Sequence, residues 1–248
     1  MSLLDRRQLL QGACAGLGAA LLGGRAASAA PAYQMAKVAR PARLSGTVRW
    51  AGRAGTPARL KLTGSCPYCL KQQIYSEELL QAPGGGLRNV AVFLEGIRLG
   101  REPRLEGAVL AENRCTFVPH VQTVTVGAKL LLHNQDPVLN TFHAVEVQTG
   151  RTLFNEGLAN KDQKLERKVR RAGLVKVLCD VHPCEVAYWV GFDHPYHTVA
   201  DKEGRFALEQ IPPGRYTLGL WHEKLGGRRQ VVTLAPDQHL KLELVYPA

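Results

Sequence analysis

A cysteine and a histidine near the C-terminal third of the chain, Cys179 and His182, have the spacing of a metal chelate. They directly follow the apolar run 173–178, which has the length and composition of a β-strand. A thiolate and an imidazole held this closely at the end of a strand suit a soft metal ion such as copper. Glu185 stands three residues further on and would add a carboxylate oxygen. The sequence therefore predicts a metal site in this loop.

The number of remaining cysteines indicates whether the Cys179 thiol has a disulfide partner. Five cysteines follow residue 29, and an odd number leaves one thiol without a partner in an oxidising compartment. If Cys179 is a ligand, four others can close two disulfides in any of three connectivities: Cys66, Cys69, Cys115 and Cys184. A thioredoxin-type redox pair at Cys66 and Cys69 is the alternative, but the strand-then-helix context is lacking. We favour structural disulfides, with Cys69 to Cys115 as the most favoured single pair.

The N-terminal segment 1–29 is typical of a bacterial twin-arginine export signal. Arg6 and Arg7 precede an apolar stretch rich in glycine and alanine, and small residues up to Ala29 suit cleavage after that position. A membrane helix is the alternative, but the apolar stretch is short for one. We expect a periplasmic protein with no integral membrane span.

The charge of the chain indicates the kind of partner. The formal net charge is +11, and removal of residues 1–29 would leave +9. A basic periplasmic protein is not expected to meet nucleic acid, and acidic proteins or anionic lipid fit better. Much of the excess lies in segment 161–171, for which we expect either docking of an acidic redox protein or a solvated loop or edge strand.

Short alternating runs separated by glycine, proline, asparagine or aspartate dominate the rest of the chain. This pattern predicts an all-β protein built as sandwiches. We expect a linker at 30–42, a first domain at 43–193 and a small β-module at 194–248, with turns near Gly204 and Gly214. A module this small buries little surface, so we expect it to pack against the domain before it for stability.

Five short motifs in a fixed order carry a resemblance to a known family. They lie at 89–94, 115–121, 134–139, 179–183 and 221–223. From residue 44 to residue 223 the chain resembles plastocyanin-like (cupredoxin) proteins of the bacterial periplasm, of the methylamine-utilisation-protein-like kind. The tail from Thr198 is similar to a carboxypeptidase-regulatory or transthyretin-like β-module. The resemblance implies an antiparallel Greek-key sandwich followed by that module.

The resemblance also implies a copper site, from which this chain departs twice. Asn140 stands where the family has its first histidine ligand, and Glu185 stands where it often has the axial methionine. His143 could supply the missing imidazole, but its odd offset along a strand points it to the opposite face unless a bulge intervenes.

Two other interpretations of the site stay open. Cys179, His182 and Glu185, with His120 or His143, would form a more polar site that suits oxidised copper or zinc. Alternatively the site has lost its metal, with Cys179 in a disulfide to Cys184 or elsewhere. His120 by itself is more typical of a buried, hydrogen-bonded histidine.

The function that follows is one-electron transfer by a copper ion held by Cys179, His182, Glu185 and His143. Neither a Ser–His–acid set nor a pair of carboxylates stands out in the sequence, so we do not expect an enzyme. The rival hypothesis is a metal-free β-sandwich that binds a carbohydrate, peptide or protein of the cell envelope.

Overall fold

The computed structural model describes residues 32–61, 66–182 and 185–248. The expected export signal and Cys184 lie outside these residues. Strands are the main regular structure of the described residues, and the only helix among these residues is one turn of 3-10 helix at Cys69–Lys71. The protein is all-β, which confirms the predicted fold class. The strands are β1 (Gln34–Met35), β2 (Ala42–Trp50), β3 (Ala91–Glu95), β4 (Leu99–Gly100), β5 (Ala108–Glu112), β6 (Phe117–Val118), β7 (Val121–Thr125), β8 (Lys129–Asn134), β9 (Asn140–Glu146), β10 (Thr152–Leu158), β11 (Lys164–Lys168), β12 (Gly173–Leu178), β13 (Val186–Phe192), β14 (His197–Val199), β15 (Arg205–Ile211), β16 (Gly214–His222), β17 (Gly226–Leu234) and β18 (His239–Tyr246).

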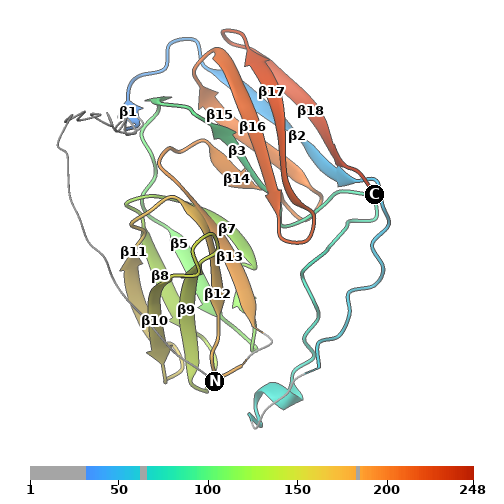
Figure 1. Ribbon diagram of the computed structural model, residues 1–248, viewed down its shortest axis with the longest axis vertical. Helices are drawn as coiled ribbons and strands as arrows, with labels where there is room; N and C mark the ends of the chain where they lie inside the picture. Colours follow the sequence, from blue (N-terminus) through green and yellow to red (C-terminus); the bar gives the residue numbers. More distant parts are fainter. Residues whose placement is uncertain (1–31, 62–65, 183–184) are drawn as a thin grey trace, which may run out of the picture. The chain divides into compact units, whose positions relative to one another are not determined.

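The first sandwich is built from the middle of the chain, β5 to β13 (Figure 1). One sheet has the strand order β10-β9-β12-β13-β7 and the other the order β11-β8-β5-β6. Alternate side chains of these strands are buried in one core, because successive residues of a strand point to opposite faces. The core includes Leu110, Phe117, Leu132, Phe142, Val175, Val177 and Trp189. Cys179 belongs to the same core, which places the predicted metal loop at the end of β12.

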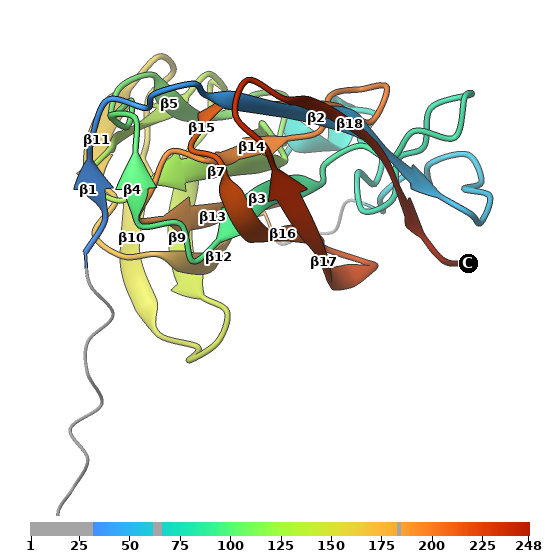
Figure 2. The ribbon, with the colours of Figure 1, turned by 90° about the horizontal axis from the view of Figure 1, so that it is seen from above.

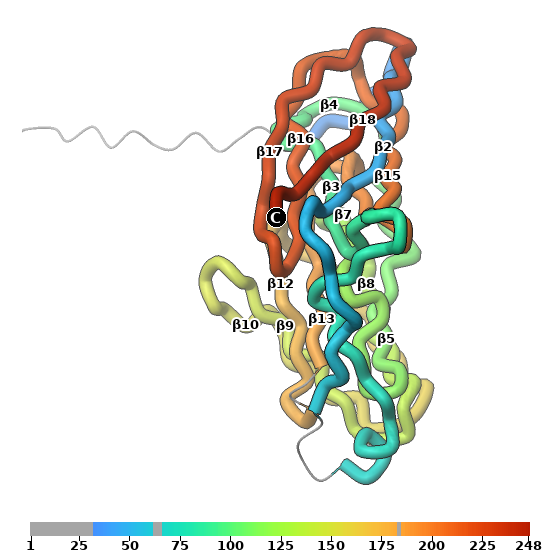
Figure 3. Tube along the Cα trace, turned by 90° about the vertical axis from the view of Figure 1, so that its right-hand side faces the viewer, coloured from blue at the N-terminus to red at the C-terminus, as the bar shows by residue number. Residues whose placement is uncertain are grey.

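The second sandwich combines strands from both ends of the described chain. Its sheets have the orders β14-β3-β16-β17 and β15-β2-β18. Strand β18 pairs in parallel with β2 along its whole length, and the two lie side by side in Figure 3. Their shared core contains Leu44, Val48, Val92, Leu94, Tyr196, Phe206, Leu218 and Leu244.

The sheets therefore do not follow the division that we expected at residue 193. Strands β2 and β3 lie within the range 43–193, yet they pair with β14 to β18 rather than with the first sandwich. The physical reason is that β2 is the central strand of a three-stranded sheet. Its backbone pairs with β15 on one side and with β18 on the other. The expected linker 30–42 also contains β1, which pairs with β4 (Figure 2).

Strand directions are mixed. Most neighbours are antiparallel, but among the described strands four pairs are parallel: β1 and β4, β2 and β18, β5 and β8, and β7 and β13. Strand β11 lies at an edge of its sheet and carries four of the charged residues of segment 161–171. Charged side chains on an edge strand discourage pairing with other chains. The part of this segment at 164–168 is therefore an edge strand, and docking of a partner by the segment stays a prediction.

Within the described residues, no helix has the length and apolarity needed to cross a bilayer.

Candidate metal site

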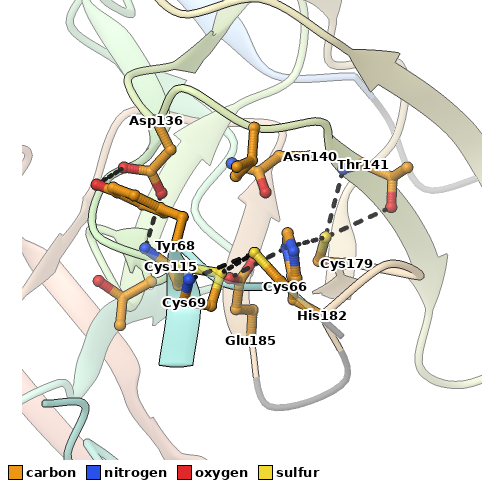
Figure 4. A network of polar contacts seen from close by, with 12 residues as sticks. Cys66, Tyr68, Cys69, Cys115, Asp136, Asn140, Thr141, Cys179, His182 and Glu185 are labelled. Atoms are coloured by element: carbon orange, nitrogen blue, oxygen red, sulfur yellow. Dashed lines mark hydrogen bonds and ion pairs between the residues drawn. A yellow bond between two sulfur atoms is a disulfide. The ribbon is translucent and has the colours of Figure 1, made fainter. Parts of the chain in front are cut away.

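Four potential ligands meet at one end of the first sandwich: Glu112, Cys179, His182 and Glu185. One ligand atom of each lies within 4.8 Å of the others. Glu112 is the last residue of β5, Cys179 follows β12 and Glu185 directly precedes β13. Their exposed fractions are 0%, 2%, 5% and 2%, so all four groups are buried. Figure 4 shows Cys179, His182 and Glu185 converging. This set is called the metal cluster below.

The backbone of β9 and the loop after β12 hold the Cys179 thiol in place. Thr141 donates to Cys179 Sγ from its backbone N–H at 3.4 Å and from its hydroxyl at 3.7 Å. The same hydroxyl accepts the N–H of Asp180 at 2.7 Å. Burial raises the pKa of the Cys179 thiol, and the charge of Glu185 raises it further. Without a cation the group is therefore a thiol at neutral pH.

His182 lies between the thiol and one carboxylate. Its Nδ1 is 3.5 Å from Cys179 Sγ and 3.5 Å from Glu185 Oε1. Burial lowers the pKa of His182, so its ring is neutral at neutral pH. A neutral imidazole is the form that binds a metal.

The two carboxyl groups are the least expected feature of the cluster. No backbone, amide or cationic group donates to the carboxyl oxygens of Glu112 and Glu185, which lie instead against each other and, for Glu185, against the Cys179 thiol. Burial raises the pKa of Glu185 to about 7 and raises that of Glu112 well above its usual value, and the proximity of the two groups adds to the shift of Glu112. Buried carboxyl groups without partners cost folding free energy unless they are protonated or meet a cation.

Asn140 occupies the position where the family resemblance places a histidine. It is fully buried at the start of β9 and donates from Nδ2 to Asn134 Oδ1 at 2.9 Å. Its own Oδ1 is buried without a hydrogen-bond partner. Asn140 therefore braces the turn between β8 and β9, and it lies near the metal cluster in Figure 4.

His143 is not brought to the metal cluster. Asn140, Phe142 and Ala144 are buried, whereas Thr141 and His143 alternate on the other face of β9. The pairing of β9 with β12 is regular from Glu146 to His143, so no bulge turns His143 inward. Its ring instead contacts Asp180 Oδ1 and Thr152 Oγ1, both at 2.9 Å.

His120 is also held away from the cluster. Its Nδ1 lies 3.1 Å from the carbonyl oxygen of Val186 and its Nε2 lies 2.7 Å from Glu223 Oε2. Burial acts to lower the pKa of His120, but the hydrogen bond and charge of Glu223 outweigh it and raise the pKa. This is the buried, hydrogen-bonded histidine that its sequence context predicted.

Glu112 is the member of the cluster that the sequence analysis missed. Leu110 and Glu112 stand two residues apart in β5, so they share the inward face of the sandwich. An acidic residue on the buried face of a strand is the feature that could have revealed it. Its partner Glu185 lies 73 positions further along the chain, and only the fold shows that the two carboxyl groups face each other.

A disulfide and an aspartate brace the loop beside the cluster. Cys69 and Cys115 are joined, as predicted. Asp136 accepts hydrogen bonds from the N–H groups of Arg114 at 2.6 Å and Cys115 at 2.7 Å, and from the hydroxyl of Tyr68 at 3.1 Å. Among the described cysteines, Cys66 and Cys179 keep free thiols. The expected alternative of a disulfide from Cys179 to Cys184 concerns a residue outside the described range.

Comparison with known proteins gives structural matches only. No protein family model matches the sequence, and no curated protein is significantly similar to it. Among solved structures, a purple cupredoxin from Nitrosopumilus maritimus is 21% identical, with a TM-score of 0.31, over 35% of this chain and 100% of its own. Amicyanin from Paracoccus versutus is 15% identical, with a TM-score of 0.32, over 37% of this chain and 86% of its own.

A copper-containing nitrite reductase from Thermus scotoductus also matches, at 15% identity and a TM-score of 0.32, over 40% of this chain and 24% of its own. These matches concern the fold of part of the chain. With such TM-scores they carry no conclusion about function, which has to come from the residues of the site.

Proposed function

We propose that this chain binds a metal ion, preferentially copper, through Cys179, His182, Glu185 and Glu112, and that it acts as a one-electron carrier. The observation that supports this most strongly is the set of four buried carboxyl oxygens that receive no hydrogen bond from any backbone, amide or cationic group, beside a thiol and a neutral imidazole. A cation bound between these groups would compensate the negative charge of the ionised carboxylates, which is costly to bury without a partner.

The donor set explains which metal states fit. One sulfur, one nitrogen and two oxygens match the preferences of Cu(II) and Zn(II), since thiolate and imidazole suit both ions and carboxylates favour the oxidised, harder form of copper. The arrangement differs from the familiar set of two histidines, a cysteine and a methionine, because Asn140 and Glu185 replace one histidine and the methionine. Copper bound here would supply one-electron redox chemistry.

The residues around the donors would keep the geometry constant between oxidation states. Thr141 fixes the sulfur of Cys179 through two contacts and fixes the following residue through a third. The rigid β9–β12 pair carries these contacts. A site whose ligands barely move loses little free energy to reorganisation when an electron arrives or leaves. We assign no enzymatic reaction to it.

The test is metal binding by the purified protein. We expect one equivalent of Cu(II) to bind and to produce an intense thiolate-to-copper absorption band, and the protein to return to that state after a cycle of reduction and oxidation. Cys179→Ser should remove the band, whereas Cys66→Ser should retain it. Binding of Zn(II) without any redox-active copper complex would contradict the electron-carrier role, and no metal binding at all would favour the metal-free alternative.

The cell location and partner belong to the same proposal. We infer a periplasmic protein from the twin-arginine segment 1–29. For the partner, the supporting feature is a groove of about 680 Å³ between β10 and β11, whose charged lining residues are two acidic ones, Glu156 and Glu166, and five basic ones, Arg151, Arg167, Lys168, Arg170 and Arg171. The last three of these form no ion pair with any described residue. The groove therefore suits an acidic protein surface.

The position of the groove limits its role. Arg171 precedes Cys179 by eight residues, so the basic end of the groove lies about 26 Å from the thiol along β12. That end fits docking of a partner better than direct electron transfer to the site. Binding of an acidic redox protein should weaken as salt rises, and a variant with Lys168, Arg170 and Arg171 changed to glutamate should lose that salt dependence. If the variant binds the acidic redox protein as the unaltered protein does, the groove is not the docking site.

A further inference from the structure

Three sulfur atoms lie in contact beside the metal cluster, and one of them is a free thiol. Cys66 Sγ lies 3.1 Å from Cys69 Sγ, which is itself bonded to Cys115 Sγ. The backbone N–H of Cys69 donates to Cys66 Sγ at 3.3 Å. Cys66 is half-buried, whereas both sulfurs of the disulfide are buried. No role described so far uses the Cys66 thiol.

The local backbone accounts for this approach. The N–H of Leu70 donates to the carbonyl oxygen of Cys66 at 3.1 Å, and the N–H of Gln72 donates to that of Cys69 at 2.8 Å. These bonds wind the segment from Cys66 to Lys71 into a turn followed by one turn of 3-10 helix. Two cysteines separated by two residues are thereby placed on one side of the turn. The disulfide to Cys115 then holds its bonded sulfur directly next to the free thiol (Figure 4).

We propose that Cys66, Cys69 and Cys115 form a thiol–disulfide exchange centre. In the exchange, the sulfur of Cys66 attacks Cys69 Sγ, a Cys66–Cys69 bond forms, the Cys69–Cys115 bond breaks and Cys115 leaves as a thiolate. The proton lost by Cys66 passes through solvent to Cys115, so the reaction is an isomerisation that needs no external oxidant or reductant. The reverse step restores the connectivity seen in the structure.

The exchange moves a free thiol from one side of the metal cluster to the other. Cys66, Cys69 and His182 have ligand atoms within 4.8 Å of one another, and so do Cys69, Cys115 and Glu185. In the described connectivity the free thiol therefore stands beside His182, and after exchange it stands beside Glu185. This consequence, which rests on the proposed metal site, means that the disulfide connectivity selects which sulfur is close enough to join the bound ion.

The experiment is a disulfide map of the metal-free protein. Exchange is stopped with acid, which suppresses thiolates, and free thiols are then alkylated in denaturant before digestion with trypsin. Cys66 and Cys69 fall in peptide 62–71, and Cys115 falls in peptide 115–129. The connectivity of the structure gives the two peptides cross-linked with Cys66 alkylated. The exchanged form gives peptide 62–71 two hydrogens lighter, separate from an alkylated peptide 115–129.

We expect both forms in the unaltered protein. In Cys66→Ser the attacking sulfur is absent, so alkylation of Cys115 should fall at least about tenfold, to background. Leu70→Ala, an exposed position in the same turn, is the matched control and should leave both forms present. A map with only the cross-linked form, or with Cys66 joined to the peptide that carries Cys184, overturns the proposal.

The result is independent of whether metal binds. Because the map is made without metal, failure of copper or zinc to bind would overturn the proposed function and leave the exchange centre standing. A second map after addition of Zn(II) tests the consequence. If the thiol beside Glu185 joins the ion, the exchanged fraction rises; an unchanged fraction separates the exchange from the metal cluster.

Discussion

At the scale of single residues, the main feature of the metal cluster is that its buried carboxyl groups have no cationic partner among the described residues. Glu112 and Glu185 are buried with no backbone, amide or cationic donor for their oxygens, and no lysine or arginine is paired with them within the described chain. In the absence of a cation and below about pH 7, the favoured state of each ligand is uncharged: two carboxylic acids, a thiol and a neutral ring. Metal binding must therefore expel protons.

Proton release makes metal affinity depend on pH. The pKa of Glu185 is raised to about 7, and the pKa values of Glu112 and Cys179 are also raised. Since these groups are protonated below their raised pKa values, affinity for Zn(II) should increase between about pH 5.5 and about pH 8, by about tenfold per pH unit for each proton released. Calorimetric titration in buffers of different ionisation enthalpy measures this, and Glu185→Gln should release fewer protons.

The raised pKa of Glu185 also determines how the stability of the metal-free protein changes with pH. A carboxyl group with a raised folded-state pKa contributes stability that is present below its unfolded value and is lost as pH rises through the folded value. For Glu185 that window runs from its ordinary value, 4.5, to about 7. Glu185→Gln should therefore flatten the fall in the unfolding midpoint of the metal-free protein across this window. An equally steep fall in the variant would show that Glu185 is not the group responsible.

Asn140 gives a second prediction at this scale. Asn140→His should place an imidazole where the family resemblance expects a ligand, at a cost of about 1–3 kcal/mol because the hydrogen bond to Asn134 is lost. Absorption and electron paramagnetic resonance spectra of the Cu(II) form should change strongly. His143→Asn is the control and should leave the spectra unaltered, since His143 contacts Asp180 and Thr152. If the spectra changed in His143→Asn and not in Asn140→His, His143 rather than the Asn140 position would lie next to the bound copper.

At the scale of elements, the loops around the metal cluster are held by Asp136 in the turn between β8 and β9. Arg114 and Cys115 both have positive φ angles, 55° and 58°, which side chains rarely adopt. The Asp136 carboxylate accepts the N–H groups of both residues and so stabilises this conformation. The loop that carries the disulfide is thus tied to the turn that leads to Asn140.

Loss of the Asp136 carboxylate should loosen this loop. Asp136→Asn replaces one acceptor oxygen by a donor, so one N–H group loses its partner, and we expect a loss of about 1.5–3 kcal/mol in the free energy of unfolding. Asp162→Asn is the matched control, because Asp162 is exposed and should change stability by less than about 0.5 kcal/mol. Urea unfolding followed by circular dichroism measures both. Equal stability of the two variants would show that Asp136 is not a brace.

At the scale of the whole molecule, the first sandwich is continuous in sequence and the second is not. Strands β5 to β13 lie between β4 and β14, whereas β2 and β3 reach the strands β14 to β18 from the other side of that insertion. All four residues of the metal cluster lie within the continuous part. The site should therefore not depend on the second sandwich.

Two fragments test this organisation. Residues 105–193 contain every strand of the first sandwich, and we expect this fragment to unfold cooperatively and to bind metal. Residues 43–193 also carry β2 and β3 without their partners, which exposes apolar side chains such as Leu44 and Val92, so this fragment should aggregate. Light scattering and thermal unfolding distinguish the two. A soluble, cooperative 43–193 fragment would contradict the pairing of these strands.

The sequence by itself determined the all-β class of the fold and placed three of the four residues of the proposed metal cluster in one loop. Alternation of apolar residues predicted the strands, including β12 with its observed bounds, because side-chain period is a local property. Proximity along the chain likewise brought Cys179, His182 and Glu185 together. The charged run at 161–171 correctly indicated an edge strand.

Only the tertiary structure decided the rest. Glu112 joins the cluster, and β2 joins β18, through pairings between segments far apart in the chain, which no local pattern encodes. His143 was excluded by the face on which a regular β9 places it. The contact of Cys66 with the Cys69–Cys115 disulfide likewise depends on packing. Local physics fixed what each segment is, and long-range packing fixed which side chains meet.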